Sequence, residues 1–148
     1  LRWLLGEAES VSAEVSRRVL GLDVEDTAHV SVRLASGALA TVALDYVQRP
    51  RAHGLEIVGA RGRIRWADDD GSAYLHDARR NRVTPFLPAP GFSRNGMFLD
   101  EMRHFLACLE GRETPSCTLE DGRAALEIAL GALRSAEEGR RIGIGGGT

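Results

Sequence analysis

Two short segments with the character of strands, at residues 55–58 and 63–66, constrain the fold of this chain most strongly. They are separated by four residues that begin and end with glycine, Gly59 and Gly62. Because glycine accepts the positive φ angles of tight reversals, this pattern predicts two strands joined by a hairpin. Strands that follow each other along a chain usually pair, so an antiparallel arrangement is expected here.

A second hairpin is predicted upstream of the first. Residues 27–34 alternate between polar and apolar side chains, Ser36 and Gly37 form a turn, and residues 38–47 return. Alternation with a period of two is typical of a half-buried strand, and a short glycine-containing turn is typical of a hairpin. Similar but shorter patterns predict further strands at residues 11–16, 72–77 and 82–86.

Two helices are predicted after the strands. Prolines at positions 85, 88 and 90 end the strand region, because proline cannot donate to a strand ladder. Residues 96–109 then place apolar side chains at helical spacing, and Gly111 is expected to stop this helix. Thr118 and Asp121 have the spacing of a capping signature, which predicts a second helix continuing to Gly139.

Strands followed by helices predict an α+β fold. We expect a predominantly antiparallel open sheet with helices on one face and the other face available for dimerisation. An antiparallel sheet with mixed side chains on both sides would otherwise leave apolar surface exposed to water.

Composition limits the functional class. The 148 residues, 43% of them hydrophobic, suit one domain with one core. A formal net charge of −2 gives no general attraction to phosphate backbones or anionic lipid, so no nucleic acid and no membrane partner is expected. No apolar run approaches the roughly 20 residues of a membrane span, and no signal peptide pattern is present, so a cytoplasmic location is expected.

The basic residues and cysteines restrict the chemistry further. All 19 basic residues are arginine, so this sequence offers no lysine for Schiff-base formation or proton transfer. Cys108 and Cys117 match neither a zinc-site spacing nor a Cys-x-x-Cys redox motif. Two reduced structural cysteines are therefore the favoured interpretation, with a regulatory disulfide as the alternative. No metal site is predicted.

The first candidate binding segment contains Arg49, Arg51 and His53. It lies where a strand is interrupted at Pro50 and the chain re-enters the sheet at Leu55. Binding groups concentrate in loops held by a rigid sheet, and arginine offers a planar fork of donors to vicinal hydroxyls or to a carboxylate. The alternative is a solvated basic turn.

The second candidate segment contains Arg94 and Asn95 at the entrance of the first predicted helix. Both side chains could contact a ligand there, but capping of the helix by Ser93 or Asn95 explains the segment slightly better. The remaining histidines have structural explanations: His29, His76 and His104.

Two other segments invite functional interpretations that we do not favour. The acidic run from Asp68 to Gly71 lacks the spaced oxygen ligands of a calcium loop, so a tight turn is predicted. The glycine-rich residues 143–148 follow no βαβ unit and open no helix. They are therefore expected to form a flexible tail rather than a dinucleotide loop.

An ordered set of motifs accompanies the hairpin at residues 55–66. It comprises Glu25-Asp26-Thr27-Ala28, Glu101-Met102-x-x-Phe105, Gly111-x-x-x-Pro115 and Leu119-Glu120-Asp121-Gly122 with Ala125 to Ala129. In this order the motifs resemble the C-terminal half of the Gfo/Idh/MocA family, the NAD(P)-dependent dehydrogenases of sugars, cyclitols and related polyols. The resemblance implies that residues 1–142 form a domain for substrate binding and oligomerisation.

The resemblance also implies what another part of the enzyme supplies. In this family the nucleotide binds an N-terminal Rossmann domain with a Gly-x-Gly-x-x-Gly turn and a catalytic lysine, and neither motif occurs in these residues. The family's catalytic histidine and aspartate would fall just before Leu1. We therefore expect no catalytic residue here and no cofactor bound by this chain alone, with NAD or NADP implied for the full-length enzyme.

The expected partners follow from the same resemblance. They are a sugar or polyol substrate, a Rossmann domain in cis or in trans, and further copies of the chain in a homodimer or homotetramer formed through the sheet face. The segment that contains Arg49, Arg51 and His53 would lie near the sugar. The alternative is a stand-alone, non-catalytic module for interaction or ligand binding that has retained the sheet.

Overall fold

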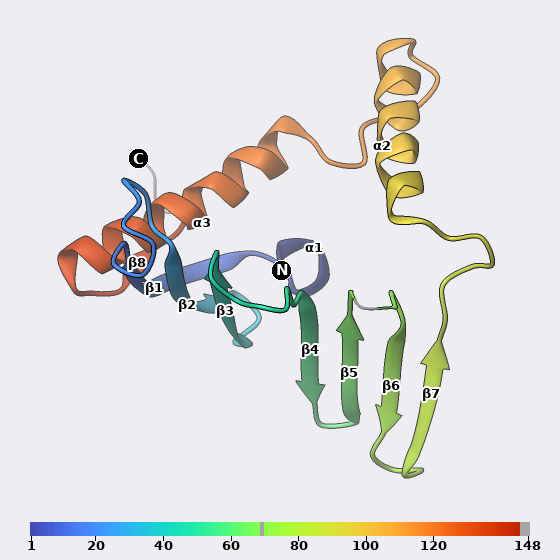
Figure 1. Cartoon of the computed structure of the whole chain (residues 1–148), viewed down its shortest axis with the longest axis horizontal. Helices are drawn as coiled ribbons and strands as arrows, with labels where there is room; N and C mark the ends of the chain where they lie inside the picture. The colour runs from blue at the N-terminus through green and yellow to red at the C-terminus, as the bar shows by residue number, and fades with distance from the viewer. Residues whose placement is uncertain (69, 146–148) are drawn as a thin grey trace. The chain divides into compact units, whose positions relative to one another are not determined.

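The computed structural model describes residues 1–68 and 70–145, and the chain divides into two compact units (Figure 1). Unit 1 comprises Leu1–Val47 and the residues from Ser116 onward, and unit 2 comprises Gln48–Pro115. The elements of unit 1 are α1 (Arg2–Leu5), β1 (Ala8–Ser16), β2 (Thr27–Leu34), β3 (Leu39–Asp45), α3 (Leu119–Glu138) and β8 (Ile142–Gly143). Those of unit 2 are β4 (Gly54–Gly59), β5 (Gly62–Ala67), β6 (Ala73–Asp77), β7 (Arg82–Phe86) and α2 (Arg94–Leu109).

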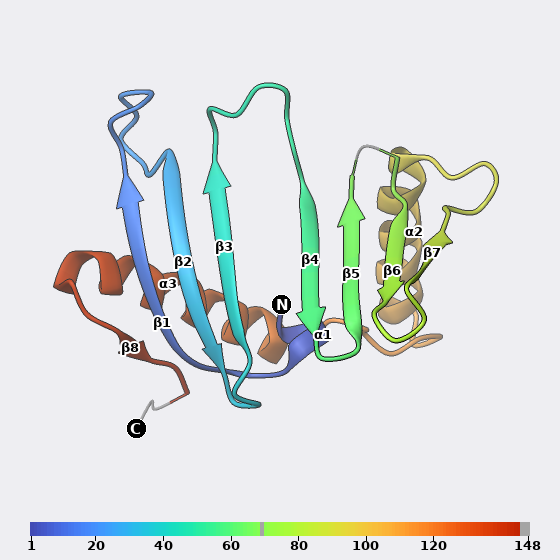
Figure 2. The same cartoon turned by 90° about the horizontal axis from the view of Figure 1, so that it is seen from below.

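Each unit contains a four-stranded antiparallel sheet, which Figure 2 shows face on for unit 1. The strand order is β3-β2-β1-β8 in unit 1 and β4-β5-β6-β7 in unit 2. The predicted α+β class and antiparallel pairing are confirmed. The hydrogen-bonded strands form two four-stranded sheets, and β3 and β4 belong to different ones.

The core of unit 1 lies between its sheet and α3, which runs across one sheet face in Figure 2. Val11 and Leu34 are fully buried there, beside Ala132 of α3. Buried Ser135 joins the two layers, because its Oγ accepts from the Ala13 amide at 3.1 Å and donates to the Arg140 carbonyl at 2.6 Å. These bonds fix α3 on β1.

A buried carboxylate organises the loop between β1 and β2. Asp26 is 1% exposed, and its Oδ2 accepts from the backbone amides of Val19 and Leu20 at 2.8 Å each. These bonds satisfy a carboxylate that would be costly to bury alone. Asp26 therefore has a structural role in one of the motifs that carry the family resemblance.

Ordered backbone hydrogen bonding extends to residue 145, three residues beyond the predicted end of the domain at residue 142. Gly143 belongs to β8 opposite Ser10, the Ile144 amide donates to the Glu9 carbonyl at 2.9 Å, and the Gly145 amide donates to Glu127 Oε1 at 2.9 Å. A flexible tail was predicted from residue 143, but glycine runs do not reveal edge pairing, and residues 143–145 are hydrogen-bonded. The rest of that predicted tail, 146–148, lies outside the described residues.

The helix boundaries agree closely with the predicted ones. Helix α2 begins at Arg94, two residues before the predicted start, and α3 lies within the predicted range. Both halves of the predicted capping box at Thr118 and Asp121 are present, and Gly139 ends α3 with a φ of 63°. Neither α2 nor α3, nor any other described helix, is long and apolar enough to cross a membrane.

Candidate functional site

A cluster of polar and aromatic side chains forms in unit 2 where β5 ends. We call it the Asp68 cluster, and its members are Arg51, His53, Trp66, Asp68 and Arg94. The Asp68 amide donates to the His53 carbonyl at 2.9 Å, one step beyond the Gly54–Ala67 pair of the β4–β5 ladder. The sheet register therefore places the Asp68 carboxylate beside the loop that carries Arg51.

The Asp68 carboxylate binds two arginines that are far apart in the sequence. Its Oδ2 accepts from Arg51 Nη2, and also from Arg94 Nη1 at 2.7 Å. Each guanidinium has five N–H donors and contacts Asp68 through one nitrogen, so each retains donors for a ligand hydroxyl or carboxylate. The arginine side chains are 62% and 55% exposed, which leaves them accessible to such a ligand.

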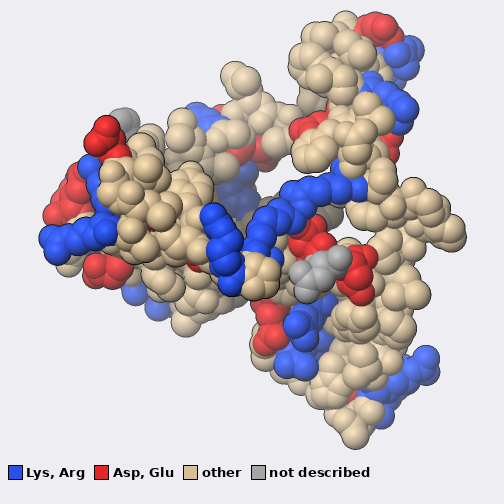
Figure 3. Space-filling view, viewed as in Figure 1, with Lys and Arg blue, Asp and Glu red and all other residues tan. Residues whose placement is uncertain are grey.

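The charges in the Asp68 cluster favour an ionised carboxylate. Partial desolvation raises the pKa of Asp68, but the hydrogen bond and charge of Arg94, and then the charge of Arg51, outweigh it, so this pKa is below its ordinary value. With two guanidinium groups and one carboxylate, the cluster has a net charge of +1. Figure 3 shows basic and acidic side chains side by side over the face it draws, and pairs such as these explain that pattern.

The aromatic part of the cluster packs at the start of β4. The rings of His53 and Trp66 meet edge to face, with centroids 5.1 Å apart and an interplanar angle of 88°. His53 and Trp66 therefore form an aromatic pair between the start of β4 and the end of β5, the strand that Asp68 follows. Apolar surface beside a few converging polar donors is the usual composition of a site for a small polar ligand.

The remaining two predicted site residues are sequence neighbours of Arg51 and Arg94. Arg49 Nη1 donates to the Gln48 carbonyl at 2.8 Å, a contact local to the loop. Asn95 is exposed in the first turn of α2, and Ser93 caps that helix by accepting from the Gly96 amide at 3.1 Å. Of the five candidates, Arg51 and Arg94 thus share the Asp68 carboxylate, and the His53 carbonyl accepts from the Asp68 amide.

Sequence reasoning missed Asp68 as a site residue, because it treated the acidic run only as a turn. The usable signal was that Asp68 lies two residues after the predicted strand at 63–66, and that the partner strand at 55–58 follows two arginines. Within the segment predicted as a turn, Asp70 Oδ1 accepts from the amide of buried Ser72 at 2.8 Å, and Asp69 lies outside the described residues. Across residues 1–68 and 70–145, no three His, Cys, Asp or Glu side chains are arranged to hold a metal ion.

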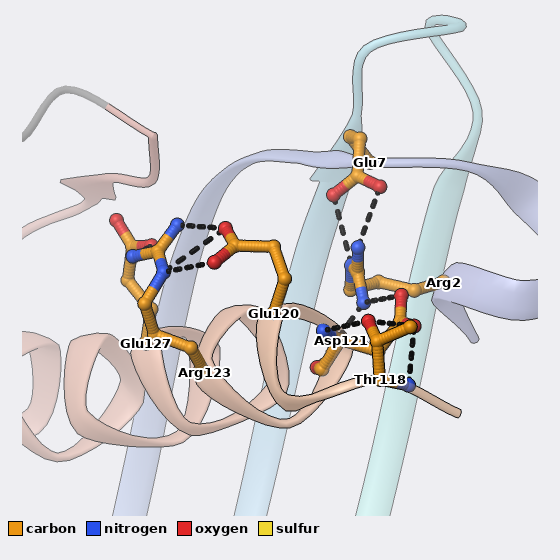
Figure 4. Close-up of polar contacts among 7 residues, drawn as sticks. All are labelled: Arg2, Glu7, Thr118, Glu120, Asp121, Arg123 and Glu127. Atoms are coloured by element: carbon orange, nitrogen blue, oxygen red, sulfur yellow. Dashed lines mark hydrogen bonds and ion pairs between the residues drawn. The ribbon is translucent and has the colours of Figure 1, made fainter. Parts of the chain in front are cut away.

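A second polar cluster lies in unit 1, and Figure 4 shows it. This Arg2 cluster contains Arg2, Glu7, Thr118 and Asp121. Arg2 donates through Nε and Nη2 to the Glu7 carboxylate at 2.8 Å each, and through Nη1 to Asp121 Oδ1 and O at 3.2 Å each. The hydrogen bond from Arg2 lowers the pKa of Glu7. The guanidinium thereby joins α1, the start of β1 and the start of α3.

The Arg2 cluster borders a largely apolar cavity of about 780 Å³ in unit 1. Its walls include Val30, Val42 and Leu44 of the sheet and Ile128 of α3. Since the polar groups at its rim are already bonded to one another, this cavity suits apolar packing better than a polyol.

The helix termini are poorly suited to the phosphates of a dinucleotide. Such phosphates need unused N–H donors at a helix N-terminus. In α3, Thr118 Oγ1 accepts from the Asp121 amide at 3.2 Å, and Glu120 and Asp121 add negative charge. In α2, Ser93 occupies the corresponding position. These two helix N-termini do not fit the phosphates of NAD, and that this chain alone binds no cofactor stays a prediction.

Comparison with known proteins identifies relatives over nearly the whole chain. Residues 1–144 match the model of the C-terminal alpha/beta domain of an oxidoreductase family, Gfo/Idh/MocA. The myo-inositol 2-dehydrogenase of Thermotoga maritima is 29% identical over 154 aligned positions, which cover 95% of this chain and 44% of that protein. The chain therefore spans less than half the length of this curated relative.

Solved structures show the same fold. A levoglucosan dehydrogenase in complex with NADH and levoglucosan matches with a TM-score of 0.85 at 20% identity, over 97% of this chain and 47% of that one. An oxidoreductase from Agrobacterium radiobacter in complex with NAD+, L-tartaric acid and magnesium matches with a TM-score of 0.79 at 21% identity, over 97% and 45%. At this identity the likeness establishes the fold.

Proposed function

Because the chain belongs to the Gfo/Idh/MocA oxidoreductase family, as its C-terminal alpha/beta domain, we propose that it binds substrate and joins subunits in an NAD(P)-dependent dehydrogenase of sugars or polyols. In this proposal the nucleotide and the catalytic groups come from a Rossmann domain, in cis or in trans. The chain is not catalytic alone, and it contributes the orientation of the substrate.

The Asp68 cluster is the observation that carries the substrate-binding part of the proposal. It presents two exposed arginines, held by one carboxylate, next to the His53–Trp66 pair. Guanidinium forks suit vicinal hydroxyls and carboxylates. The relatives add support, since their complexes contain levoglucosan and L-tartaric acid, a sugar derivative and a hydroxy acid.

Asp68 has a positioning role in this proposal. Arginine side chains lose considerable rotamer freedom when they bind a ligand, and a carboxylate that already holds both of them reduces that cost. Asp68 also accepts from one nitrogen of each arginine, which restrains both guanidinium groups. Arg49 and Asn95, which lie outside the cluster, remain candidates for contacts at its edge.

The test is steady-state kinetics of the full-length enzyme with Arg51→Ala and Arg94→Ala. Loss of one charge-assisted hydrogen bond costs about 1.5–3 kcal/mol, so kcat/KM for the sugar or polyol should fall by about ten- to a hundredfold. The KM for the nucleotide and the melting temperature should stay nearly unchanged. Arg82→Ala, at an exposed position in β7, is the matched control. Unchanged kinetics for both cluster variants would reduce the segment to a solvated basic turn.

A further inference from the structure

A cysteine, a histidine and a glutamate meet at the C-terminal end of α2. We call this group the Cys108 cluster. Cys108 Sγ lies 3.6 Å from His104 Nε2, and His104 Nδ1 lies 2.5 Å from Glu113 Oε2. The order thiol, imidazole, carboxylate is the arrangement in which a base activates a nucleophile and a third group orients the base.

Local structure explains why these three side chains meet. His104 and Cys108 are four residues apart on α2 and therefore share a helix face. Gly111, with a φ of 70°, reverses the chain after the helix, and the Glu113 amide donates to the Ala107 carbonyl at 3.3 Å. This returning segment brings the Glu113 carboxylate to the side of His104 that faces away from Cys108.

The hydrogen bonds determine which imidazole nitrogen can act as a base. A carboxylate at Nδ1 favours the tautomer with its proton on Nδ1, because only that tautomer donates to Glu113. Nε2 is then the unprotonated nitrogen, and it is the nitrogen nearest the Cys108 thiol. Cys108 and His104 are both partly exposed, so a small reagent can approach the sulfur.

We propose that Cys108 is a site of thiol–disulfide exchange with small-molecule disulfides, with His104 as the base and Glu113 as a positioning residue. Sγ attacks one sulfur of the reagent, a new S–S bond forms, the reagent's own S–S bond breaks, and its second sulfur leaves as a thiolate. The thiol proton passes to His104 Nε2 and then to solvent. Cys108 and one half of the reagent end as a mixed disulfide. This proposal does not depend on the proposed function.

Cys117 is an internal control for the experiment. It is exposed in unit 1, whereas Cys108 is partly buried in unit 2, so accessibility alone would make Cys117 the faster of the two. Trypsin separates the two cysteines, because arginines at positions 103, 112 and 123 place them in peptides 104–112 and 113–123. Labelling of each cysteine can therefore be followed separately in the full-length protein.

The experiment measures labelling of the full-length protein by 2,2′-dithiodipyridine at pH 7, resolved by peptide mass. An ordinary free cysteine is only a few per cent thiolate at this pH. Complete conversion to thiolate would therefore raise its labelling rate by at most about thirtyfold. We expect peptide 104–112 to be labelled about tenfold faster than peptide 113–123. His104→Gln should remove that advantage, Glu113→Gln should reduce it, and His76→Gln, the same change elsewhere in unit 2, should leave it intact.

Labelling in urea gives the rate of the unstructured thiol. Native Cys108 must react faster than this reference, a comparison that requires no variant to fold. Native Cys108 reacting more slowly than in urea would show a shielded structural cysteine and overturn the proposal. Equal labelling of Cys108 in the His104→Gln and His76→Gln proteins would overturn the role of His104.

Discussion

Arg2 shows how much a single side chain can organise at the residue scale. Its planar guanidinium binds the Glu7 carboxylate through two nitrogens and Asp121 through a third, which the point charge of a lysine could not reproduce. Asp121 also completes the capping box with Thr118, so one carboxylate both caps α3 and anchors α1. The Arg2 cluster therefore couples the start of the chain to the start of α3.

This coupling predicts a specific pH dependence of stability. Bonding to Arg2 lowers the pKa of Glu7 below its ordinary 4.5, and bonding to Thr118 and Arg2 lowers the pKa of Asp121 below 3.8. A depressed folded-state pKa gives stability that is present above the ordinary value and lost as pH falls through the lowered value. Arg2→Met should therefore destabilise the protein at pH 7, by an amount that shrinks below about pH 4.5.

Urea unfolding at pH 7, 4 and 3 measures this difference between the wild-type and Arg2→Met proteins. Arg18→Met, in the exposed loop after β1, is the matched control and should show no such trend. A wild-type advantage over Arg2→Met that stays constant down to pH 3 would mean that the bonds from Arg2 to the Glu7 and Asp121 carboxylates do not account for it.

At the scale of a single element, two glycines of helix α3 have very different surroundings. A Cβ added at Gly131 would meet Ile144 Cδ1 at 2.7 Å and Val11 Cγ1 at 3.1 Å, whereas a Cβ added at Gly122 would meet nothing within 4 Å. Ile144 can move at the end of a flexible side chain, but Val11 is fully buried and β-branched. Gly131 is thus required for the close approach of α3 to β1.

We therefore predict opposite effects of the same substitution. Gly122→Ala should stabilise the protein by about 0.5–1 kcal/mol, because it removes an exposed glycine from a helix interior. Gly131→Ala gains the same propensity but overpacks the core, which costs about 1–3 kcal/mol, so a net loss of about 1 kcal/mol is expected. Calorimetric melting temperatures compare the two variants directly. Stabilisation by both would show that Val11 repacks without cost.

The elements that the sequence predicted well are those with local signals. Thr118 and Asp121 marked the start of α3 because a capping box spans only four residues. The Asp68 cluster was only partly predictable, since Asp68 and Arg94 are 26 residues apart and no local pattern links them. Pairing of β8 with β1 joins Gly143 to Ser10, and a glycine run carries no side-chain pattern that reveals such a partner.

At the scale of the whole molecule, the two faces of the unit 1 sheet differ in what they contact, and this difference bears on assembly. One face packs against α3, and the opposite face, which we call the uncovered face, carries mainly small or polar side chains. Its central row is Ser12, Ser31 and Thr41, aligned across β1, β2 and β3. Small side chains permit close approach of a second sheet, and a standard interface would bury about 1,600 Å² in total.

We predict that the uncovered face joins two copies of the chain, and that Ser31→Arg weakens the assembly. Ser31 is exposed at the centre of the row, so an arginine there would meet its own symmetry mate across a twofold interface. Light scattering of the full-length protein at tens of micromolar should show the assembly in the wild type and its loss in the variant. Ser36→Arg, in the exposed turn between β2 and β3, makes the same change away from this face and should leave the assembly intact. A strictly monomeric wild-type protein, or a Ser31→Arg protein that assembles normally, would exclude this face as the interface.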